Sequence, residues 1–142
     1  MDKEKVEKFY NRYSDIYEKE YSDRFVDSLF EHFLNKSLPR KKHLKILDAG
    51  GGIGRFSIPL AKKNHEVTLT DISQEMINTA RKIIERQTIK NILLKKESIL
   101  QMKSQKSNYF DVVLLMNGVL DYCQHPNKAI CEVFRVLKKQ GL

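Results

Sequence analysis

The chain of 142 residues has no tryptophan, two cysteines, three prolines and no long apolar run. Its longest uninterrupted apolar stretch, residues 112–116, is far shorter than the roughly 20 residues that a membrane-spanning helix needs. We therefore predict neither a membrane span nor a membrane partner. The charged first ten residues are not followed by an apolar region, so no secretory signal is predicted and the expected location is the cytoplasm.

The two cysteines are too few and too isolated to predict a covalent or metal framework. Cys123 and Cys131 are eight positions apart, with no CxxC pair and no histidine at metal-ligand spacing. We expect reduced thiols and no metal site.

Charge of both signs is plentiful, but it is unevenly distributed along the chain. Residues 1–39 carry seven Lys or Arg against nine Asp or Glu, whereas the remainder carries 19 against nine, and the net charge is +8. Such a basic body is compatible with an RNA partner. Most lysines stand singly or in pairs, however, and only residues 40–43 form a cluster, so the charge allows RNA binding without favouring it.

Two amphipathic helices are predicted at the start of the chain. Apolar side chains recur there at steps of three and four, which is the spacing of one helix face. The first set is Val6, Phe9, Tyr10, Tyr13 and Tyr17, and the second is Phe25, Val26, Leu29, Phe30, Phe33 and Leu34. Pro39 ends the second pattern, so we predict a helical cap over residues 1–39 and a core over residues 40–142.

The core alternates short β-rich runs with helix-length segments, which predicts an α/β fold with a parallel sheet. Strands are expected over residues 45–49, 66–71, 92–97 and 110–117, with helices over 55–63, 73–86 and 126–137. Ser73 is expected to cap its helix, and Pro126 occupies the favoured first turn of the last helix. The side chains expected to be buried by this last helix are Ala129, Ile130, Val133, Phe134 and Leu137.

The most informative segment is a glycine turn directly after the first predicted strand. It reads Asp48-x-Gly50-x-Gly52-x-Gly54, and Arg55 stands where a dinucleotide fingerprint would need its third glycine. A second acid, Asp71, ends the next strand 23 positions later, close to the spacing of about 20 for a carboxylate that receives ribose hydroxyls. Two carboxylates would repel a pyrophosphate, so they favour a ligand with a ribose and an ammonium or sulfonium group.

At these residues the sequence resembles the class I S-adenosylmethionine-dependent methyltransferases. Residues 48–54 are similar to the first motif of that family, Asp71 to its ribose-binding acid, 110–120 to its fourth-strand motif, and 134–138 to its RVLKPGG segment. The likeness extends over almost all of residues 44–141. It implies a Rossmann-like sheet of about four strands in the order 3-2-1-4, S-adenosylmethionine as cofactor and S-adenosylhomocysteine as product. The expected acceptor is a small molecule.

The resemblance also implies which residues hold the cofactor. Gly50 and Gly52 would pass beneath the methionine part, with Asp48 near its amino group, and Asp71 would take the ribose hydroxyls. Ile72 and Met76 would pack on the adenine, although ordinary core packing explains them equally well. The remaining cofactor-binding residues implied are Gly51, Ser98, Ile99, Asn117, Tyr10 and Tyr17. Ser98 stands where members often carry an acid for the adenine amino group, and Glu97 is its possible substitute.

Residues 10–18 resemble the cap segment that closes over the cofactor in many small-molecule members. That segment often reads YD-xx-A-xx-YD, and Asn11, Ser14 and Glu18 depart from it. Core packing of the tyrosines is an equally good explanation of the pattern.

Methyl transfer is an in-line displacement that requires alignment more than a base, so a dedicated base is not required. The catalytic candidates by location after the fourth strand are Asp121, Tyr122 and His125. The segment that begins at Asn117 lacks the Asn-Pro-Pro-aromatic run of enzymes that methylate base amino groups, which disfavours that chemistry.

Length is the main departure from the family. Its sheet usually has seven strands, and this chain stops after the fourth strand and its helix, so strands five to seven are absent. We expect the edge of the strand over residues 110–117 to be exposed and prone to self-association. Two alternatives stay open: a non-catalytic module or fragment that binds S-adenosylmethionine, and an RNA-directed methyltransferase.

Overall fold

The computed structural model describes residues 2–20 and 24–142, with the side chains of 15, 18–20, 24–27 and 30 outside the description. Two helices, α1 (Lys3–Glu20) and α2 (Arg24–Ser37), precede the core. The core elements are β1 (Lys45–Ala49), α3 (Ser57–Lys62), β2 (Glu66–Asp71), α4 (Gln74–Arg86), β3 (Ile92–Lys96), β4 (Val112–Leu114) and α5 (Pro126–Val136). None of these helices is long and apolar enough to cross a bilayer.

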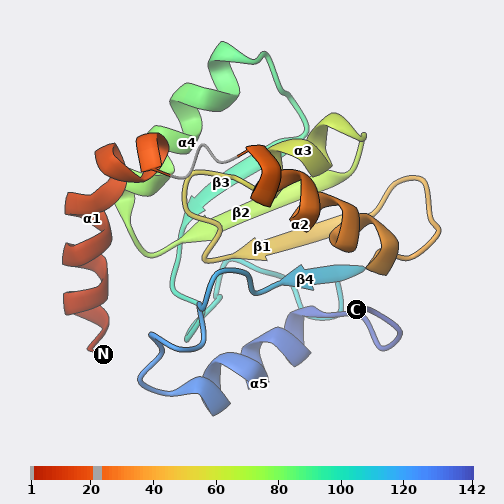
Figure 1. Cartoon of the computed structure of the whole chain (residues 1–142). Helices are drawn as coiled ribbons and strands as arrows, with labels where there is room; N and C mark the ends of the chain where they lie inside the picture. Colours follow the sequence, from red (N-terminus) through yellow and green to blue (C-terminus); the bar gives the residue numbers. More distant parts are fainter. Residues whose placement is uncertain (1, 21–23) are drawn as a thin grey trace.

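The four strands form one parallel sheet in the order β3-β2-β1-β4 (Figure 1). The central strands β1 and β2 pair in register from Lys45 opposite Glu66 to Ala49 opposite Thr70. Both are buried along almost their whole length, as continuous apolar runs in parallel sheets usually are. The α/β fold and the strand order expected from the sequence are confirmed.

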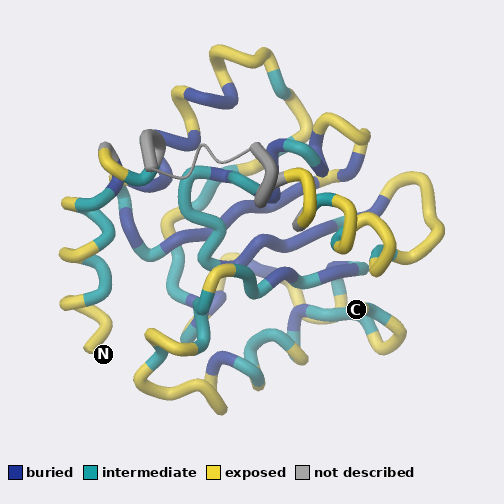
Figure 2. The backbone as a smooth tube through the Cα atoms, in the orientation of Figure 1, coloured by how far each residue is buried: buried dark blue, intermediate teal, exposed yellow. Residues whose placement is uncertain are grey.

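Helices cover both faces of the sheet, and the central strands β1 and β2 are buried between them (Figures 1 and 2). On one face, α2, α3 and α4 pack over two apolar clusters, which include Leu60 against β1 and Ile77 against Leu69 of β2. On the other face, Ala129 and Val136 of α5 pack against Leu47 and neighbouring side chains. This layering is typical of α/β folds built from βαβ units.

Helix α1 lies apart from both layers. The arrowheads of the strands point toward α1, which crosses the carboxyl ends of the sheet and packs against α4 (Figure 1). In open α/β sheets, ligands bind at this end. Helix α1 is therefore placed where it can cover a ligand.

Several helices and strands are shorter than predicted. The strand expected over 110–117 is a strand only from Val112 to Leu114, because Asn117 and Gly118 adopt positive φ angles of 55° and 75° that turn the chain away. Phe110 makes a single bridge to Leu137 instead. The helix expected over 55–63 begins at Ser57, since residues 52–56 complete the glycine turn. The third strand ends at Lys96, one residue early.

The burial predicted for α5 was partly wrong, and the apolar face predicted for α2 is only partly covered. Phe134 of α5 is 72% exposed, while its neighbours Val133 and Val136 pack on the sheet. Phe33 and Leu29 of α2 are 59% and 46% exposed, because the helix docks through Leu34 instead. The other apolar side chains of the predicted face, those of Phe25, Val26 and Phe30, lie outside the description.

The outer edge of β4 is not bare along its whole length. The Leu142 N–H donates to the Asp111 carbonyl at 3.0 Å, and the Val113 N–H donates to the Leu142 carbonyl at 2.8 Å. The hydrogen bonds place Leu142 alongside β4 in the pattern of a parallel pair. Self-association through this edge stays a prediction.

Candidate functional site

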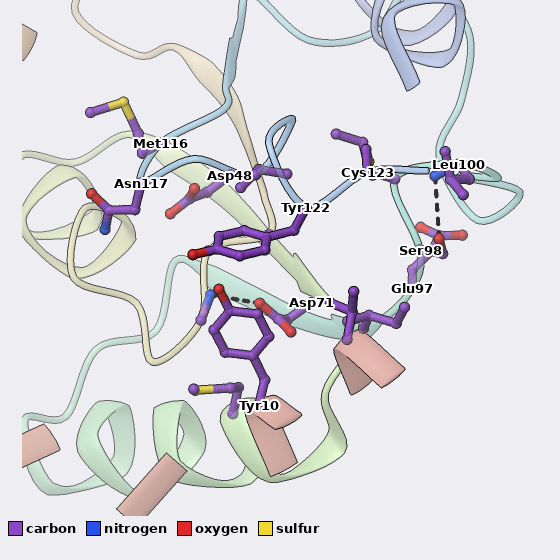
Figure 3. A pocket seen from close by; sticks show the side chains of 18 of the residues that line it. Tyr10, Asp48, Asp71, Glu97, Ser98, Leu100, Met116, Asn117, Tyr122 and Cys123 are labelled. Carbon is purple, nitrogen blue, oxygen red and sulfur yellow. Dashed lines mark hydrogen bonds between the residues drawn. The ribbon is translucent and has the colours of Figure 1, made fainter. Parts of the chain in front are cut away.

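A pocket opens at the carboxyl ends of β1 and β2, between the glycine turn and α1 (Figure 3). Its walls come from the glycine turn, the ends of three strands, the start of α4, the loop after β4, and one face of α1. The lining residues predicted from the sequence are Tyr10, Tyr17, Asp48, Gly50, Gly51, Gly52, Asp71, Ile72, Met76, Ser98, Ile99, Asn117 and Tyr122. The structure thus brings every predicted cofactor-binding residue to one cavity.

The glycine turn is fixed by hydrogen bonds to the neighbouring strand. The N–H groups of Gly50 and Gly51 donate to the Thr70 carbonyl at 2.8 and 3.0 Å. A side chain on Gly50 would lie 2.7 Å from Val119, and one on Gly51 would lie 2.7 Å from Asp48, so both positions are closed by packing.

Gly52 is different, because its missing side chain leaves open space. It adopts a φ of +56°, and a Cβ there would meet only the Met76 sulfur, at 4.0 Å. The backbone at Gly52 is therefore the part of the turn that a ligand can approach closely.

Asp48 is buried at the end of β1 with one oxygen satisfied and the other not. Ser57 donates its hydroxyl to Oδ2 of Asp48 at 2.7 Å, whereas Oδ1 is buried without a partner among the described residues. Burial raises the pKa of Asp48 to about 6, an effect that the Ser57 hydrogen bond opposes and the nearby Asp71 charge reinforces. An unpartnered buried carboxylate oxygen is costly unless a ligand supplies a donor or a positive charge.

Asp71, at the end of β2, faces the same cavity from the other side (Figure 3). Its two oxygens accept backbone hydrogen bonds from Gly52 at 2.9 Å and from Ser73 at 2.8 Å. Burial raises its pKa, and these backbone hydrogen bonds oppose the rise. A carboxylate has about four acceptor positions, so each oxygen can still accept a ligand hydroxyl.

The far wall is mostly apolar. Ile72 and the buried Met76 come from the start of α4 and the turn before it, and Ser98 and Ile99 follow β3. Ser98 accepts a hydrogen bond from the Leu100 N–H at 3.3 Å, drawn in Figure 3.

Glu97 also lines the pocket, but its carboxylate is already engaged. Its oxygens accept from the Ser104 N–H at 2.7 Å, the Ser104 hydroxyl at 2.8 Å and the Gln105 amide at 2.7 Å. Glu97 therefore serves chiefly to hold the following loop, which weakens the hypothesis that it substitutes for the missing adenine-binding acid.

Two tyrosines extend into the cavity from opposite sides. Tyr10 of α1 and Tyr122 of the loop after β4 form an edge-to-face pair with ring centroids 6.1 Å apart (Figure 3). Tyr17, two turns further along α1, lines the same cavity. Aromatic rings with hydroxyl tips can exclude water while still offering a hydrogen bond.

Among the three catalytic candidates, only Tyr122 lines the pocket. The Asp121 carboxylate lies near Gly118, and His125 immediately precedes α5 as its N-cap residue without a side-chain cap hydrogen bond. Both are exposed and absent from the pocket wall.

Sequence reasoning missed several lining residues. They are Lys3, Val6, Arg55, Phe56, Leu100, Met116, Val119, Cys123 and Gln124. Val6 was within reach of prediction, since it stands four positions before Tyr10 and shares its helix face. The residues after β4 depend on the loop conformation, for which the sequence carries no periodic signal.

A family model described as a methyltransferase domain matches residues 40–142. The chain belongs to this methyltransferase family. The membership expected from the motifs is therefore confirmed, including the class I S-adenosylmethionine-dependent type, and S-adenosylmethionine is the cofactor of that family.

Curated relatives of this methyltransferase domain span several named activities. YqeM of Bacillus subtilis is 33% identical over 137 residues, covering 94% of this chain and 53% of the relative. The ubiquinone/menaquinone biosynthesis C-methyltransferase UbiE of Zymomonas mobilis is 34% identical, covering 68% of this chain and 39% of the relative. The tRNA 5-carboxymethoxyuridine methyltransferase of Escherichia coli K12 is 29% identical, covering 70% and 38%. The chain thus spans about half the length of such relatives or less.

Solved structures share the fold of the domain. A SAM-dependent methyltransferase from Aquifex aeolicus has a TM-score of 0.75 at 21% identity, covering 88% of this chain and 67% of that one. Phosphoethanolamine N-methyltransferase 1 of Haemonchus contortus, solved with phosphoethanolamine and S-adenosylhomocysteine, has a TM-score of 0.70 at 18% identity, covering 97% and 31%.

Proposed function

We propose that the pocket of this methyltransferase domain binds S-adenosylmethionine, and that the whole protein transfers its methyl group to a small molecule. One observation carries the proposal: the carboxylates of Asp48 and Asp71 line a single cavity beside the open backbone of Gly52. The unpartnered Oδ1 of Asp48 provides an acceptor for the ammonium group of the cofactor. The residues present fit the cofactor that the family implies.

The pocket offers a suitable contact for each part of the cofactor. Asp71, fixed by the Gly52 and Ser73 N–H groups, is held ready for the ribose hydroxyls. The methionine part would pass over Gly52, where no side chain intervenes. Ile72, Met76 and Ile99 form the apolar surface that an adenine ring needs.

The chemistry needs little from the protein beyond alignment. S-adenosylmethionine supplies a methyl group activated by a positively charged sulfur. Tyr10 and Tyr122 would exclude water from the reacting centre. Tyr122 would also position the acceptor, because it is the one of the three catalytic candidates that lines the cavity. No residue is assigned as a base.

The location of the basic cluster at residues 40–43 favours a small acceptor over RNA. The cluster at residues 40–43 precedes β1, so it lies at the end of the sheet opposite the pocket. Within it, the Lys41 ammonium is paired with Asp111 at 3.1 Å. RNA retention on a filter at two salt concentrations tests this assignment: we expect weak retention, and strong retention that falls when Arg40 and Lys42 are neutralised would support the RNA-directed alternative.

Calorimetric titration of S-adenosylhomocysteine tests the binding proposal. We expect wild-type chain to bind, Asp71→Asn to bind at least tenfold more weakly, and the exposed-acid control Glu85→Gln to match wild type. Absence of binding by a folded wild-type chain would overturn the proposal. Binding by the chain without methyl transfer by the whole protein would favour the non-catalytic module.

A further inference from the structure

Helix α1 presents two different faces at the pocket. Val6, Tyr10 and Tyr17 face the cavity, whereas Glu7 and Asn11 belong to the face that meets β3 and α4. The first face covers the pocket and the second fastens the helix. Neither Glu7 nor Asn11 lines the cavity.

Asn11 hydrogen-bonds to Ser73, the residue that caps α4. Its Oδ1 accepts a hydrogen bond from the Ser73 hydroxyl at 2.6 Å and lies 3.4 Å from the Glu75 N–H. The Ser73 hydroxyl in turn accepts from the Met76 N–H at 3.1 Å. Helix N-termini leave N–H groups unsatisfied, so Asn11 and Ser73 together complete the first turn of α4.

The same Ser73 fixes the acid expected to hold the ribose. The Ser73 N–H donates to Oδ1 of Asp71 at 2.8 Å, and the Gly52 N–H donates to Oδ2 at 2.9 Å. An unbroken series of hydrogen bonds therefore runs from α1 through Asn11, Ser73 and Asp71 to the glycine turn. Ser73 is fully buried, so its hydrogen bonds to Asp71 and Met76 are shielded from water, and its bond to Asn11 is partly shielded.

We propose that Asn11 is a positioning residue for the cofactor. Its amide oxygen holds α1 across the pocket and fixes the turn that presents Asp71, so cofactor affinity depends on a side chain outside the pocket wall. This inference rests on the proposed function, since it assumes that S-adenosylmethionine occupies the cavity. Asn11 fixes the turn by accepting the Ser73 hydrogen bond, so an aspartate at the same position can accept it too.

A second contact that holds α1 is an exposed ion pair. Glu7 pairs with Lys96 at 2.6 Å, but the Lys96 side chain is 44% exposed. Exposed ion pairs contribute little to stability, typically below about 1 kcal/mol. This pair supplies a matched control, because it ties the same helix to the sheet without touching Ser73 or Asp71.

The test compares three variants by calorimetric titration with S-adenosylhomocysteine. Asn11→Ala removes the amide oxygen while favouring the helix, so the fold is retained. We expect it to bind about tenfold more weakly than wild type, and we expect Asn11→Asp to bind within about threefold of wild type because it keeps an acceptor. Glu7→Gln should also stay within about threefold.

Hydrogen exchange of the α1 amides gives an independent reading. In the presence of S-adenosylhomocysteine, we expect α1 to exchange faster in Asn11→Ala than in wild type or Asn11→Asp. Asn11→Ala that binds as tightly as wild type would overturn the inference, as would Asn11→Asp that binds as weakly as Asn11→Ala. Failure of wild type itself to bind would instead refute the proposed function, so the two failures are distinguishable.

Discussion

Asp48 and Asp71 both lie near the carboxyl ends of neighbouring strands, yet their surroundings give them different tasks. Asp71 accepts two backbone hydrogen bonds, which stabilise its charged form. Asp48 is hydrogen-bonded by Ser57 alone among the described residues, through its hydroxyl and its backbone N–H, and one of the buried Asp48 oxygens has no partner among them. At residue scale, Asp48 is thus the acid that lowers the stability of the ligand-free protein and that a positively charged ligand would satisfy.

Asp48→Asn is expected to stabilise the ligand-free chain. The rise of the Asp48 pKa from 3.8 to about 6 means that the buried charge costs up to about 3 kcal/mol above pH 6, and we expect the variant to recover about 1–3 kcal/mol of unfolding free energy at pH 7.5. The gain should disappear as the pH falls toward 4, because the wild-type carboxyl is then protonated. Urea unfolding at both pH values measures it.

The same variant should bind S-adenosylhomocysteine more weakly, which distinguishes a functional acid from a structural one. Loss of stability at pH 7.5 would contradict the account, since it would mean that the folded protein requires the charge at Asp48.

His65 provides a second pH dependence, of opposite sign. Its buried ring accepts a hydrogen bond from the Leu44 N–H at 3.2 Å through Nδ1, and burial lowers its pKa from 6.5, with help from His43 and Lys63. The unfolded chain therefore takes up this proton first, and stability should fall as the pH drops below about 6.5. We expect urea midpoints of Asp48→Asn, measured between pH 8 and 5.5, to show this decline.

Adding His65→Gln to that background should flatten the decline, whereas His32→Gln, at an exposed histidine of α2 that does not act on His65, should preserve it. An unchanged slope in the His65 variant would show that another group is responsible.

At the scale of elements, helix α2 shows how an apolar pattern can mislead. Its three- and four-residue spacing predicted the helix, but Phe33 points to solvent while Leu34 packs beside the cluster around Leu44 and Ile46. The apolar spacing therefore predicts a wider apolar face on α2 than the part that contacts the core. Figure 2 shows the described part of this helix to be largely exposed.

A matched pair of variants tests the docking of α2. We expect Leu34→Ala to lower the free energy of unfolding by about 1–2 kcal/mol, because it opens space against the core, and Phe33→Ala to change it by less than about 0.5 kcal/mol. Thermal or urea unfolding would measure both. Equal losses at the two positions would mean that α2 packs in a different orientation.

The elements that were predictable are those with a strong local signal. The glycine turn, the acids at two strand ends and the Ser73 cap each follow from residue chemistry within a short segment, and the Ser73 hydroxyl does accept from the Met76 N–H. The end of β4 and the engagement of Glu97 were not predictable, because they depend on how residues 97–125 fold back. The fastening by Asn11 joins positions 62 residues apart, for which sequence spacing gives no indication.

At the scale of the whole molecule, the outer edge of β4 is only partly paired. In the part of the chain that the structure describes, Leu142 is the residue that pairs with this edge, through the backbone of Asp111 and Val113. A strand edge with unpaired N–H and C=O groups is a template for pairing with another chain. We therefore expect the sedimentation coefficient of the 142-residue chain to rise with concentration. A constant monomer value at high concentration would contradict this expectation.

Asp71 is proposed to receive the ribose of S-adenosylmethionine, and removing the ribose hydroxyls instead of the acid tests this role most directly. The dissociation constants of S-adenosylhomocysteine and its 2′,3′-dideoxy analogue would be measured with wild type and Asp71→Asn. We predict that wild type loses about 30-fold or more with the analogue and the variant loses little, since the interaction is already gone. Equal affinity of wild type for both ligands would contradict the assignment.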